Sequence, residues 1–350
     1  MSESPRPELP RPEELQPVAD NCARILEQLD RILLGRADLH RMVLIGLLSR
    51  GHILLEGLPG LGKTAMIHAV GAILHLDFKR VQFTPDLMPG DILGAHLLQD
   101  TPEGGRDLVF RPGPVFTNIL LADEINRASP KTQSALLETM QEGSVTLLGQ
   151  TRRVPQPFFV LASQNPIELE GTYPLPEAQL DRFLFRVLVD AVDTDTLEGI
   201  VRGRRRGEAP TPTWTLPPDG LAQAFAVMDR ILLPKAVARY VARLVAASHA
   251  TAAEAPAKVR QYVRYGASPR AAIGIAEAAR AAALLDRRPT VGFEDVRLVT
   301  SAVLNHRLVL NYQARYDQVT ASMLVDDLLA AVPEVAMDLP EDVNVGGGER

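Results

Sequence analysis

Residues 53–64 read ILLEGLPGLGKT, and this stretch decides the fold of the chain. The apolar run 53–55 leads into the pattern G-x-x-x-x-G-K-T, and helix-favouring residues follow from Ala65. A strand, a glycine-rich turn and a helix in this order are the context that a phosphate-binding loop requires. Glycines let successive backbone N–H groups point at phosphates, and the helix N-terminus adds partial positive charge. The stretch therefore predicts a nucleoside triphosphate site, a turn without a ligand being the weaker alternative.

The residues expected to contact the nucleotide form one continuous run. They are Gly57, Leu58, Pro59, Gly60, Leu61, Gly62, Lys63, Thr64 and Ala65. Lys63 is expected to reach the β- and γ-phosphates, and Thr64 to place its hydroxyl on Mg²⁺.

Length and composition describe an ordinary globular protein. Of 350 residues, 46% are hydrophobic and 23% charged, and the net charge of −6 does not favour a surface that coats nucleic acid. The single cysteine, Cys22, excludes an internal disulfide and fits a reducing compartment. The N-terminus lacks an apolar signal region, and the longest apolar runs are too short to span a bilayer. We expect a cytoplasmic protein without membrane insertion.

Five short apolar runs alternate with helical patterns in the first half of the chain. They are 53–55, 81–83, 119–121, 158–161 and 183–189. Apolar strands separated by helices favour a parallel sheet covered on both faces. The sequence predicts an α/β domain over residues 14–192.

The strand pattern stops after Asp190. Residues 193–332 are rich in alanine, leucine and arginine with helical periodicity, which predicts a separate, all-helical domain. The ends, 1–13 and 333–350, are rich in proline, glycine and charge, so we expect disordered tails there.

A second acidic element follows the phosphate loop by about 60 residues. The run 119–124 reads ILLADE, so two carboxylates emerge where a buried strand ends, at the edge where α/β sheets bind ligands. Asp123 is expected to hold Mg²⁺, through water. Glu124 is expected to orient and deprotonate an attacking water.

Three further residues complete the candidate site. Asn165 follows the apolar strand that begins at residue 158, and from spacing alone it is as readily a turn residue as a γ-phosphate sensor. Arg182 precedes the last strand, and Arg270 opens a helix of the second domain. Charge on a transferring phosphoryl group needs a cation, although either arginine taken singly is more simply a surface ion pair.

Together these motifs resemble the AAA+ ATPases. Within them, several stretches are similar to the MoxR family: 81–89 (VQFTPDLMP), 111–116 (RPGPVF), 121–127 (LADEINR), 164–168 (QNPIE), 171–183 (GTYPLPEAQLDRF), 265–270 (YGASPR) and 303–307 (VLNHR). The similarity covers roughly residues 20–330.

The resemblance implies a fold and assigns roles. The fold is an AAA+ P-loop αβα sandwich with a five-stranded parallel sheet, followed by an all-helical lid. Asn165 becomes sensor 1, Arg182 an arginine finger that serves a neighbouring subunit, and Arg270 the sensor 2 arginine. Gly35 falls where such proteins hold the adenine.

Two inserts typical of this branch are also visible. One is a hairpin near 91–110 with Gly104 and Gly105 at its tip, and the other spans 144–154 and is expected to turn at Gly149-Gln150. In related rings such inserts face the central pore. Leu147 and Leu148 would then be exposed apolar residues that a partner covers, unless they pack on their own domain.

The implied function is Mg²⁺-dependent ATP hydrolysis by a ring, a hexamer in such proteins. The ring would remodel or activate a partner protein, chaperone-fashion, and MoxR-like proteins commonly work with a partner that carries a von Willebrand factor A domain.

Other functions remain open. A nucleic-acid motor shares similar inserts, but the acidic charge disfavours it. A non-hydrolysing scaffold would not need Glu124, Asn165 and Arg182. A small-molecule kinase fits the Asp-Glu pair and the helical domain less well.

Overall fold

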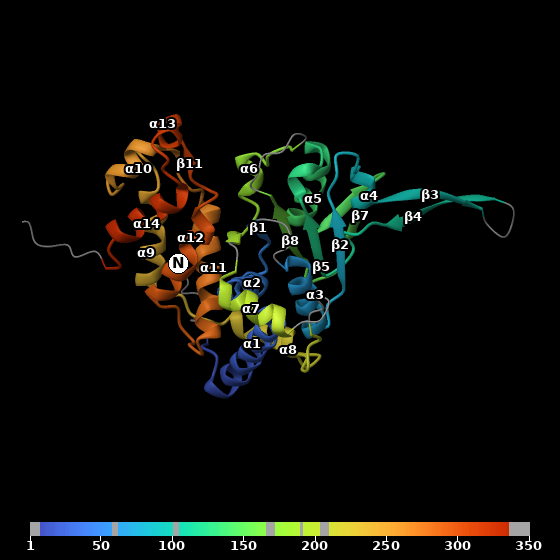
Figure 1. Cartoon of the computed structure of the whole chain (residues 1–350), viewed down its shortest axis with the longest axis horizontal. Helices are drawn as coiled ribbons and strands as arrows, with labels where there is room; N and C mark the ends of the chain where they lie inside the picture. Colours follow the sequence, from blue (N-terminus) through green and yellow to red (C-terminus); the bar gives the residue numbers. More distant parts are fainter. Residues whose placement is uncertain are drawn as a thin grey trace, which may run out of the picture.

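The computed structural model describes residues 8–57, 62–100, 105–165, 172–189, 192–203 and 210–335 (Figure 1). Several predictions fall outside these residues. They concern Leu58, Pro59, Gly60 and Leu61 of the phosphate loop, Gly104 of the first hairpin, residues 166–168 and 171 of the family motifs, and the outermost parts of both tails.

A five-stranded sheet forms the centre of the first domain, called here the sheet domain. Its order is β2 (Phe78–Gln82), β5 (Ile119–Asp123), β8 (Phe159–Gln164), β1 (Ile53–Gly57) and β9 (Phe185–Val189). Every neighbouring pair is parallel. This confirms the predicted five-stranded parallel sheet, and it brings the carboxyl ends of all five strands to one edge.

Alternate residues of each strand enter different cores, as the two-residue period of a strand requires. Ile53, Leu121 and Leu161 pack with α1 (Pro12–Ile32), α2 (Ala37–Leu48) and α3 (Lys63–Leu74). On the other face, Leu120 and Val160 pack with α5 (Pro130–Glu142). Helices therefore cover both faces of the sheet, as the αβα prediction requires.

The described N-terminal segment leads into the first helix. The first helix begins at Pro12, and Pro10 is already buried. Arg230 donates hydrogen bonds to the carbonyls of Glu8 and Leu9 and to the carboxylate of Glu14. The predicted tail, residues 1–13, therefore overlaps the start of α1, and Arg230 binds the backbone carbonyls of its residues 8 and 9.

The second domain, called here the lid, is mainly helical. Its elements are α9 (Lys235–Ala247), α10 (Ala257–Tyr262), β10 (Val263–Tyr265), α11 (Pro269–Leu285), α12 (Phe293–Leu304), β11 (Val309–Leu310), α13 (Tyr312–Tyr316) and α14 (Ala321–Ala331). The antiparallel pair β10–β11 corrects the all-helical prediction. Asn311 closes it by bonding the carbonyls of Tyr262 and Gln261, a long-range contact that strands of two and three residues do not reveal in sequence.

The segment between the two domains lies on the sheet domain. Here α8 (Gly220–Met228) packs against α1, and the connector before it donates a hydrogen bond from Leu216 N to Ile73 O at 2.8 Å. Thr196 of α7 (Thr194–Gly203) lies against Gly35. The helices that follow residue 193 therefore cover the first domain before the chain enters the lid.

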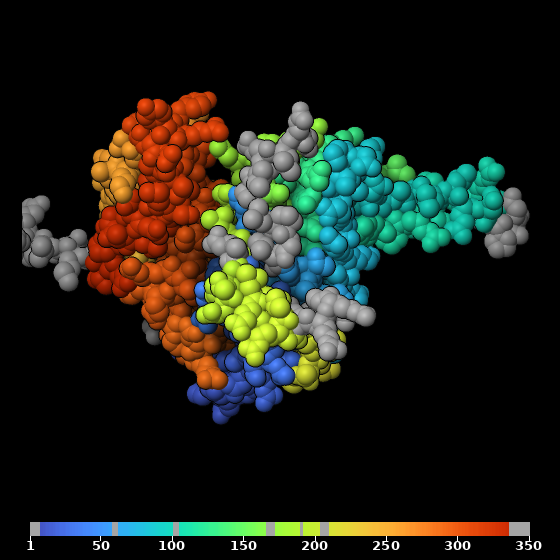
Figure 2. Space-filling view, in the orientation of Figure 1, coloured from blue at the N-terminus to red at the C-terminus, as the bar shows by residue number. Residues whose placement is uncertain are grey.

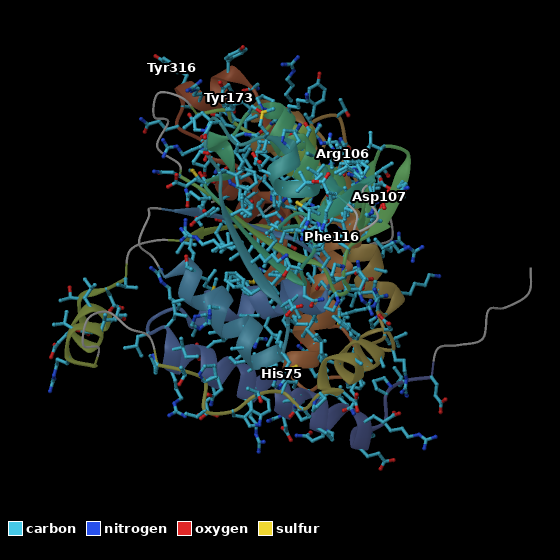
Figure 3. All side chains as sticks on the ribbon, turned by 90° about the vertical axis from the view of Figure 1, so that its right-hand side faces the viewer. His75, Arg106, Asp107, Phe116, Tyr173 and Tyr316 are labelled. Carbon is cyan, nitrogen blue, oxygen red and sulfur yellow. The ribbon has the colours of Figure 1, made fainter. Side chains whose placement is uncertain are left out.

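Both predicted hairpins are present. The first, β3 (Gly94–Asp100) with β4 (Arg106–Pro112), follows α4 (Pro89–Leu93) and projects from the body as a two-stranded ribbon (Figures 1 and 2). Arg106 and Asp107, labelled in Figure 3, are exposed on it.

The second hairpin pairs β6 (Ser144–Leu147) with β7 (Gln150–Arg153). Its turn is Leu148-Gly149, both with positive φ, so the predicted turn at Gly149-Gln150 is wrong by one residue. Burial of Val145 and partial burial of Leu147 against the same core fix the register. Leu147 therefore packs on its own domain, whereas Leu148 is 74% exposed.

Two short helices, η1 (Ile125–Arg127) and α6 (Glu177–Leu180), complete the sheet domain. Cys22 lies in the core, where burial raises the pKa of its thiol to about 12. Within the described ranges, none of the helices combines the length and apolarity that a membrane span needs.

Candidate functional site

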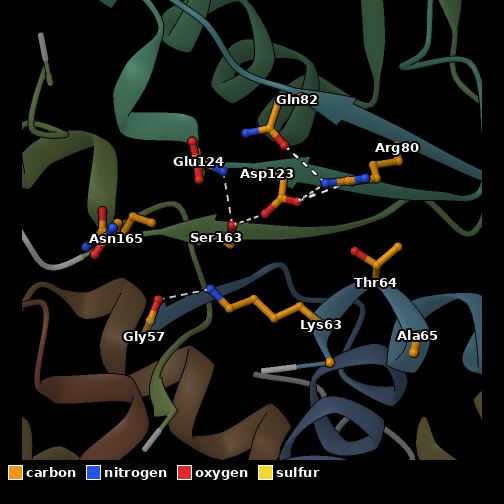
Figure 4. A pocket seen from close by; sticks show the side chains of 12 residues that line it. Gly57, Lys63, Thr64, Ala65, Arg80, Gln82, Asp123, Glu124, Ser163 and Asn165 are labelled. Carbon is orange, nitrogen blue, oxygen red and sulfur yellow. Dashed lines mark hydrogen bonds and ion pairs between the residues drawn. The ribbon is translucent and has the colours of Figure 1, made fainter. Parts of the chain in front are cut away.

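A cavity of about 400 Å³ opens at the carboxyl edge of the sheet (Figure 4). Residues from the predicted phosphate loop, the acidic strand and the sensor strand line it together: Gly57, Gly62, Lys63, Thr64, Ala65, Asp123, Glu124 and Asn165. All the described members of these three predicted groups thus meet in one place.

The loop side of the cavity joins β1 to α3. Gly62 has φ +80°, a backbone conformation that favours glycine, and a Cβ there would also require the end of the Leu33 side chain to move. Lys63 begins α3, and its Nζ donates to Gly57 O at 3.2 Å. Burial lowers the pKa of Lys63, opposed by the charges of Asp123 and Glu124.

The acidic pair sits at the end of β5, and Ser163 of the neighbouring strand β8 connects its two members. The Ser163 hydroxyl donates to Asp123 Oδ1 at 2.5 Å and accepts from the backbone N–H of Glu124 at 3.0 Å. Glu124 has φ +54°, a left-handed conformation that is costly for a residue with a Cβ. Its Oε2 accepts a hydrogen bond from Arg127 Nη1 at 3.2 Å. The hydroxyl fixes the backbone from which Glu124 extends.

Asn165 follows β8 and lies at the cavity wall beside Gln164. Its carbonyl accepts a hydrogen bond from Asn126 Nδ2 at 3.3 Å, and the Asn126 carbonyl accepts from Tyr173 N at 2.6 Å. One buried asparagine therefore connects the segment after the acidic strand to the segment after the sensor strand.

Sequence reasoning did not assign four residues of this wall. They are Arg80 and Gln82 on β2, and Ser163 and Gln164 on β8. Arg80 donates from Nη2 and Nε to Asp123 Oδ2, at 2.7 Å and 3.2 Å. The sequence does show two polar residues, Arg80 and Gln82, on either side of the apolar Val81. This alternation predicts that one face of the strand is polar, but it does not predict which residues that face contacts.

A second cavity, of about 540 Å³, contains Gly35. It lies between the start of α2 and the last residues of β9, 187–189, with Asp30 and Met42 on its wall. Gly35 has φ +70°, and a Cβ on it would lie 2.6 Å from Thr196. Apolar side chains of Leu39, Met42 and residues 187–189 line it together with the charged Asp30, Arg36 and Asp38, so the cavity combines apolar surface with a few polar groups.

The two arginines are not among the residues that line the first cavity. Arg182 lies just before β9, in a segment held by the buried Arg307, which donates to Asp181 Oδ1 at 2.8 Å and to Phe183 O at 2.6 Å. Arg270, at the start of α11, is half exposed, and its Nη1 lies 3.7 Å from Asp181 Oδ2. The structure therefore gathers the loop, acid and amide residues but leaves both arginines apart.

Comparison with known proteins agrees with this architecture. Residues 52–185 match the model of the ATPase family associated with various cellular activities (AAA), and residues 255–328 match that of an AAA lid domain. Chaperone MoxR1 of Mycobacterium tuberculosis is 41% identical over 315 residues, which cover 89% of this chain and 82% of that protein.

Two further relatives extend the comparison. Protein MoxR of Paracoccus denitrificans is 34% identical over 324 residues, covering 87% of this chain and 94% of that one. A crystal structure of a Cytophaga hutchinsonii protein has a TM-score of 0.83 at 34% identity, covering 92% of this chain and 97% of that chain. With relatives of this identity over about nine-tenths of its length, the chain belongs to the MoxR family of AAA ATPases.

Proposed function

We propose that this ATPase hydrolyses ATP with Mg²⁺ in a ring of six subunits and uses the energy to remodel or activate a partner protein. The observation that carries the proposal is the convergence of Lys63, Thr64, Asp123, Glu124 and Asn165 on one cavity. These residue types, at the carboxyl edge of a parallel sheet, are those that bind and hydrolyse a nucleoside triphosphate.

The residues present fit a magnesium ion. Mg²⁺ prefers hard oxygen donors, and Thr64 and Asp123 supply a hydroxyl and a carboxylate at the same cavity. We assign these two residues to the ion, Asp123 acting through water. When bound, Mg²⁺ would neutralise phosphate charge.

The protein residues divide the remaining work. Lys63 compensates charge that the phosphates already carry in the ground state, so its main contribution is to binding. Glu124 acts on the attacking water, and its contribution therefore appears in the transition state. Asn165 holds that water or the γ-phosphate, while residues 57–65 surround the phosphates and Gly35 borders the adenine.

Ring formation is supported by where the arginines lie. Arg182 is absent from the described wall of its own cavity, which agrees with a finger that serves the nucleotide of a neighbouring subunit. Arg270 is the sensor 2 residue in this proposal. The lid carries it, so loss of the γ-phosphate would move the lid as a rigid body.

The partner is proposed from the relatives and from the hairpins. One relative is named a chaperone, and a partner with a von Willebrand factor A domain is what the family resemblance implies. The exposed Leu148 at the tip of the second hairpin offers an apolar contact for such a partner at the pore. Because the chain is acidic, a nucleic-acid substrate is the less favoured alternative.

A Glu124→Gln variant tests the proposed chemistry. It should bind ATP as the wild type does and lose turnover by about 10²–10⁴-fold, because the amide cannot accept the proton of the water. Isothermal titration gives the affinity, and phosphate release gives the rate. Glu142→Gln, an exposed glutamate at the end of α5, is the matched control and should match the wild type. Wild-type turnover in Glu124→Gln would contradict the assignment of the base.

A further inference from the structure

Arg80 connects the edge strand β2 to the acidic strand β5 inside the cavity. Its guanidinium donates twice to one oxygen, Asp123 Oδ2, at 2.7 Å from Nη2 and 3.2 Å from Nε. Nη2 also donates to Gln82 Oε1 at 3.2 Å (Figure 4). Two bonds from one planar group to one carboxylate fix both the charge and the direction of that carboxylate.

The other oxygen of Asp123 is also engaged. Ser163 Oγ donates to Oδ1 at 2.5 Å, so both oxygens of the carboxylate that we assign to the ion already have donors. Asp123 is only 16% exposed, whereas Arg80 is 47% exposed and reaches the carboxylate from the surface. Ser163 lies on an inner strand, so Arg80 is the donor that can leave.

Charge makes this arrangement sensitive to a cation. The described wall of the cavity carries two cations, Lys63 and Arg80, and two carboxylates, Asp123 and Glu124. A divalent cation brought to Asp123 would meet the guanidinium at close range and be repelled by it. The two cations therefore cannot share Asp123 Oδ2 without cost.

We propose that Arg80 is a positioning residue that holds Asp123 in the absence of metal and leaves it when Mg²⁺ and nucleotide enter. This inference rests on the proposed function, since it requires nucleotide and Mg²⁺ at this cavity. Arg80 then sets how strongly nucleotide binding depends on Mg²⁺. Without the ion it is a second cation beside the phosphates, and with the ion it is the group that must be displaced.

Replacing Arg80 by glutamine should move the two dissociation constants in opposite directions, and both changes raise the ratio of the metal-free constant to the Mg²⁺ constant. Without Mg²⁺, the nucleotide should bind more weakly, because the variant lacks a cation near the phosphates. With Mg²⁺, the nucleotide should bind more tightly, because the ion no longer has to displace the Arg80 guanidinium from Asp123. The ratio of the dissociation constants without and with Mg²⁺ should therefore rise, by about tenfold if one charge-assisted contact is involved.

The probe is a fluorescent, non-hydrolysable ATP analogue, titrated into the full chain in excess EDTA and in excess Mg²⁺. Because no turnover occurs, the ratio of the two dissociation constants is independent of catalytic rate. Lys79→Gln is the matched control: Lys79 lies on the same strand, is exposed, and bonds to Phe116 O at 3.1 Å, away from the cavity. It should keep the wild-type ratio, and Arg80→Lys should restore part of it.

Two results would overturn the inference alone. One is an equal ratio in Arg80→Gln and the wild type, and the other is an Arg80→Lys variant that behaves like Arg80→Gln. A thermal unfolding curve for each variant shows whether it folds, which half-exposed Arg80 should permit. If the wild type itself does not bind the analogue in excess Mg²⁺, the proposed function fails, and the inference fails with it. If the wild type binds but Arg80→Gln leaves the ratio unchanged, only the inference fails.

Discussion

The carboxyl edge of the sheet and the segment around Asp181 differ in how their charged side chains are placed. At the edge, Lys63, Asp123 and Glu124 face one cavity of about 400 Å³. Around Asp181, Arg307 is buried on the carboxylate, while Arg270 stays half exposed and 3.7 Å away. In the first region the charged side chains line a cavity that a ligand could enter. In the second, Arg307 of the lid forms a buried ion pair with Asp181 of the sheet domain and so joins the two domains. Under the proposed function, the residues of one subunit would bind the nucleotide, and Arg182 of a neighbouring subunit would be needed for full turnover.

The largest effect should come from Arg182. Its replacement by alanine should leave ATP affinity unchanged and lower turnover, by about 10³–10⁵ in well-studied NTPases. Arg182→Ala subunits mixed with Lys63→Ala subunits should recover activity, because some interfaces then join an intact loop to an intact finger. Arg239→Ala, exposed on α9, is the control. If the mixture co-assembles but shows no recovery, Arg182 would act in the site of its own subunit, and the proposed division of the catalytic residues between subunits would be wrong.

The next effect should come from Lys63. Its Nζ is the loop cation of the cavity, so Lys63→Ala should weaken ATP binding by about 10–100-fold, the value of one strong charge-assisted contact. Titration calorimetry measures the loss. If Lys63→Ala kept its affinity and lost only turnover, the division between a binding residue and a transition-state residue would be wrong.

The two arginines near Asp181, Arg307 and Arg270, should differ in how much each contributes to the free energy of unfolding. Arg307 is 4% exposed and also bonds the carbonyls of Asp181, Phe183 and Leu184, so Arg307→Ala should lower the free energy of unfolding by about 3–5 kcal/mol. Arg270→Ala, at a half-exposed pair, should cost about 0.5 kcal/mol or less. Urea unfolding of both variants tests this. Equal losses would mean that the pair is not what joins the lid to the segment of Arg182.

The smallest effect on stability should come from the second hairpin. Leu148 is 74% exposed at φ +50°, so Leu148→Asn should leave the free energy of unfolding unchanged or raise it by about 0.5 kcal/mol. Leu147→Ser should instead destabilise, by about 1 kcal/mol, because Leu147 packs against the core. Thermal unfolding separates the two. If Leu148→Asn destabilises as much as Leu147→Ser, the tip is core and its proposed role as a partner contact fails.

The sequence predicted the sheet well because its signals are local. Most of the strands contain an apolar run next to a helical pattern, and the parallel arrangement follows from that alternation. The exception is β2, which reads FKRVQ. The second hairpin shows the limit. Glycine at 149 marks a turn, but the register depends on which of Val145 and its neighbours are buried, which is decided by a core built from distant segments.

In the candidate site, too, some residues could be assigned from the sequence and others could not. Residues 57–65 and the pair Asp123-Glu124 could be assigned from spacing, because a backbone turn and a strand end determine them locally. Arg80 could not, since it is 43 residues from Asp123 in the chain. Only the register of β2 against β5 makes them neighbours.

By itself, the sequence determined that this protein has a phosphate loop, an acidic strand end and a five-stranded parallel sheet, because each is encoded in a short run of residue types. The tertiary structure alone decided what those groups meet. It placed Ser163 and Arg80 on the two oxygens of Asp123 and buried Arg307 on Asp181. The reason is physical: hydrogen bonds and ion pairs between distant segments depend on strand register and domain packing, which no local pattern records.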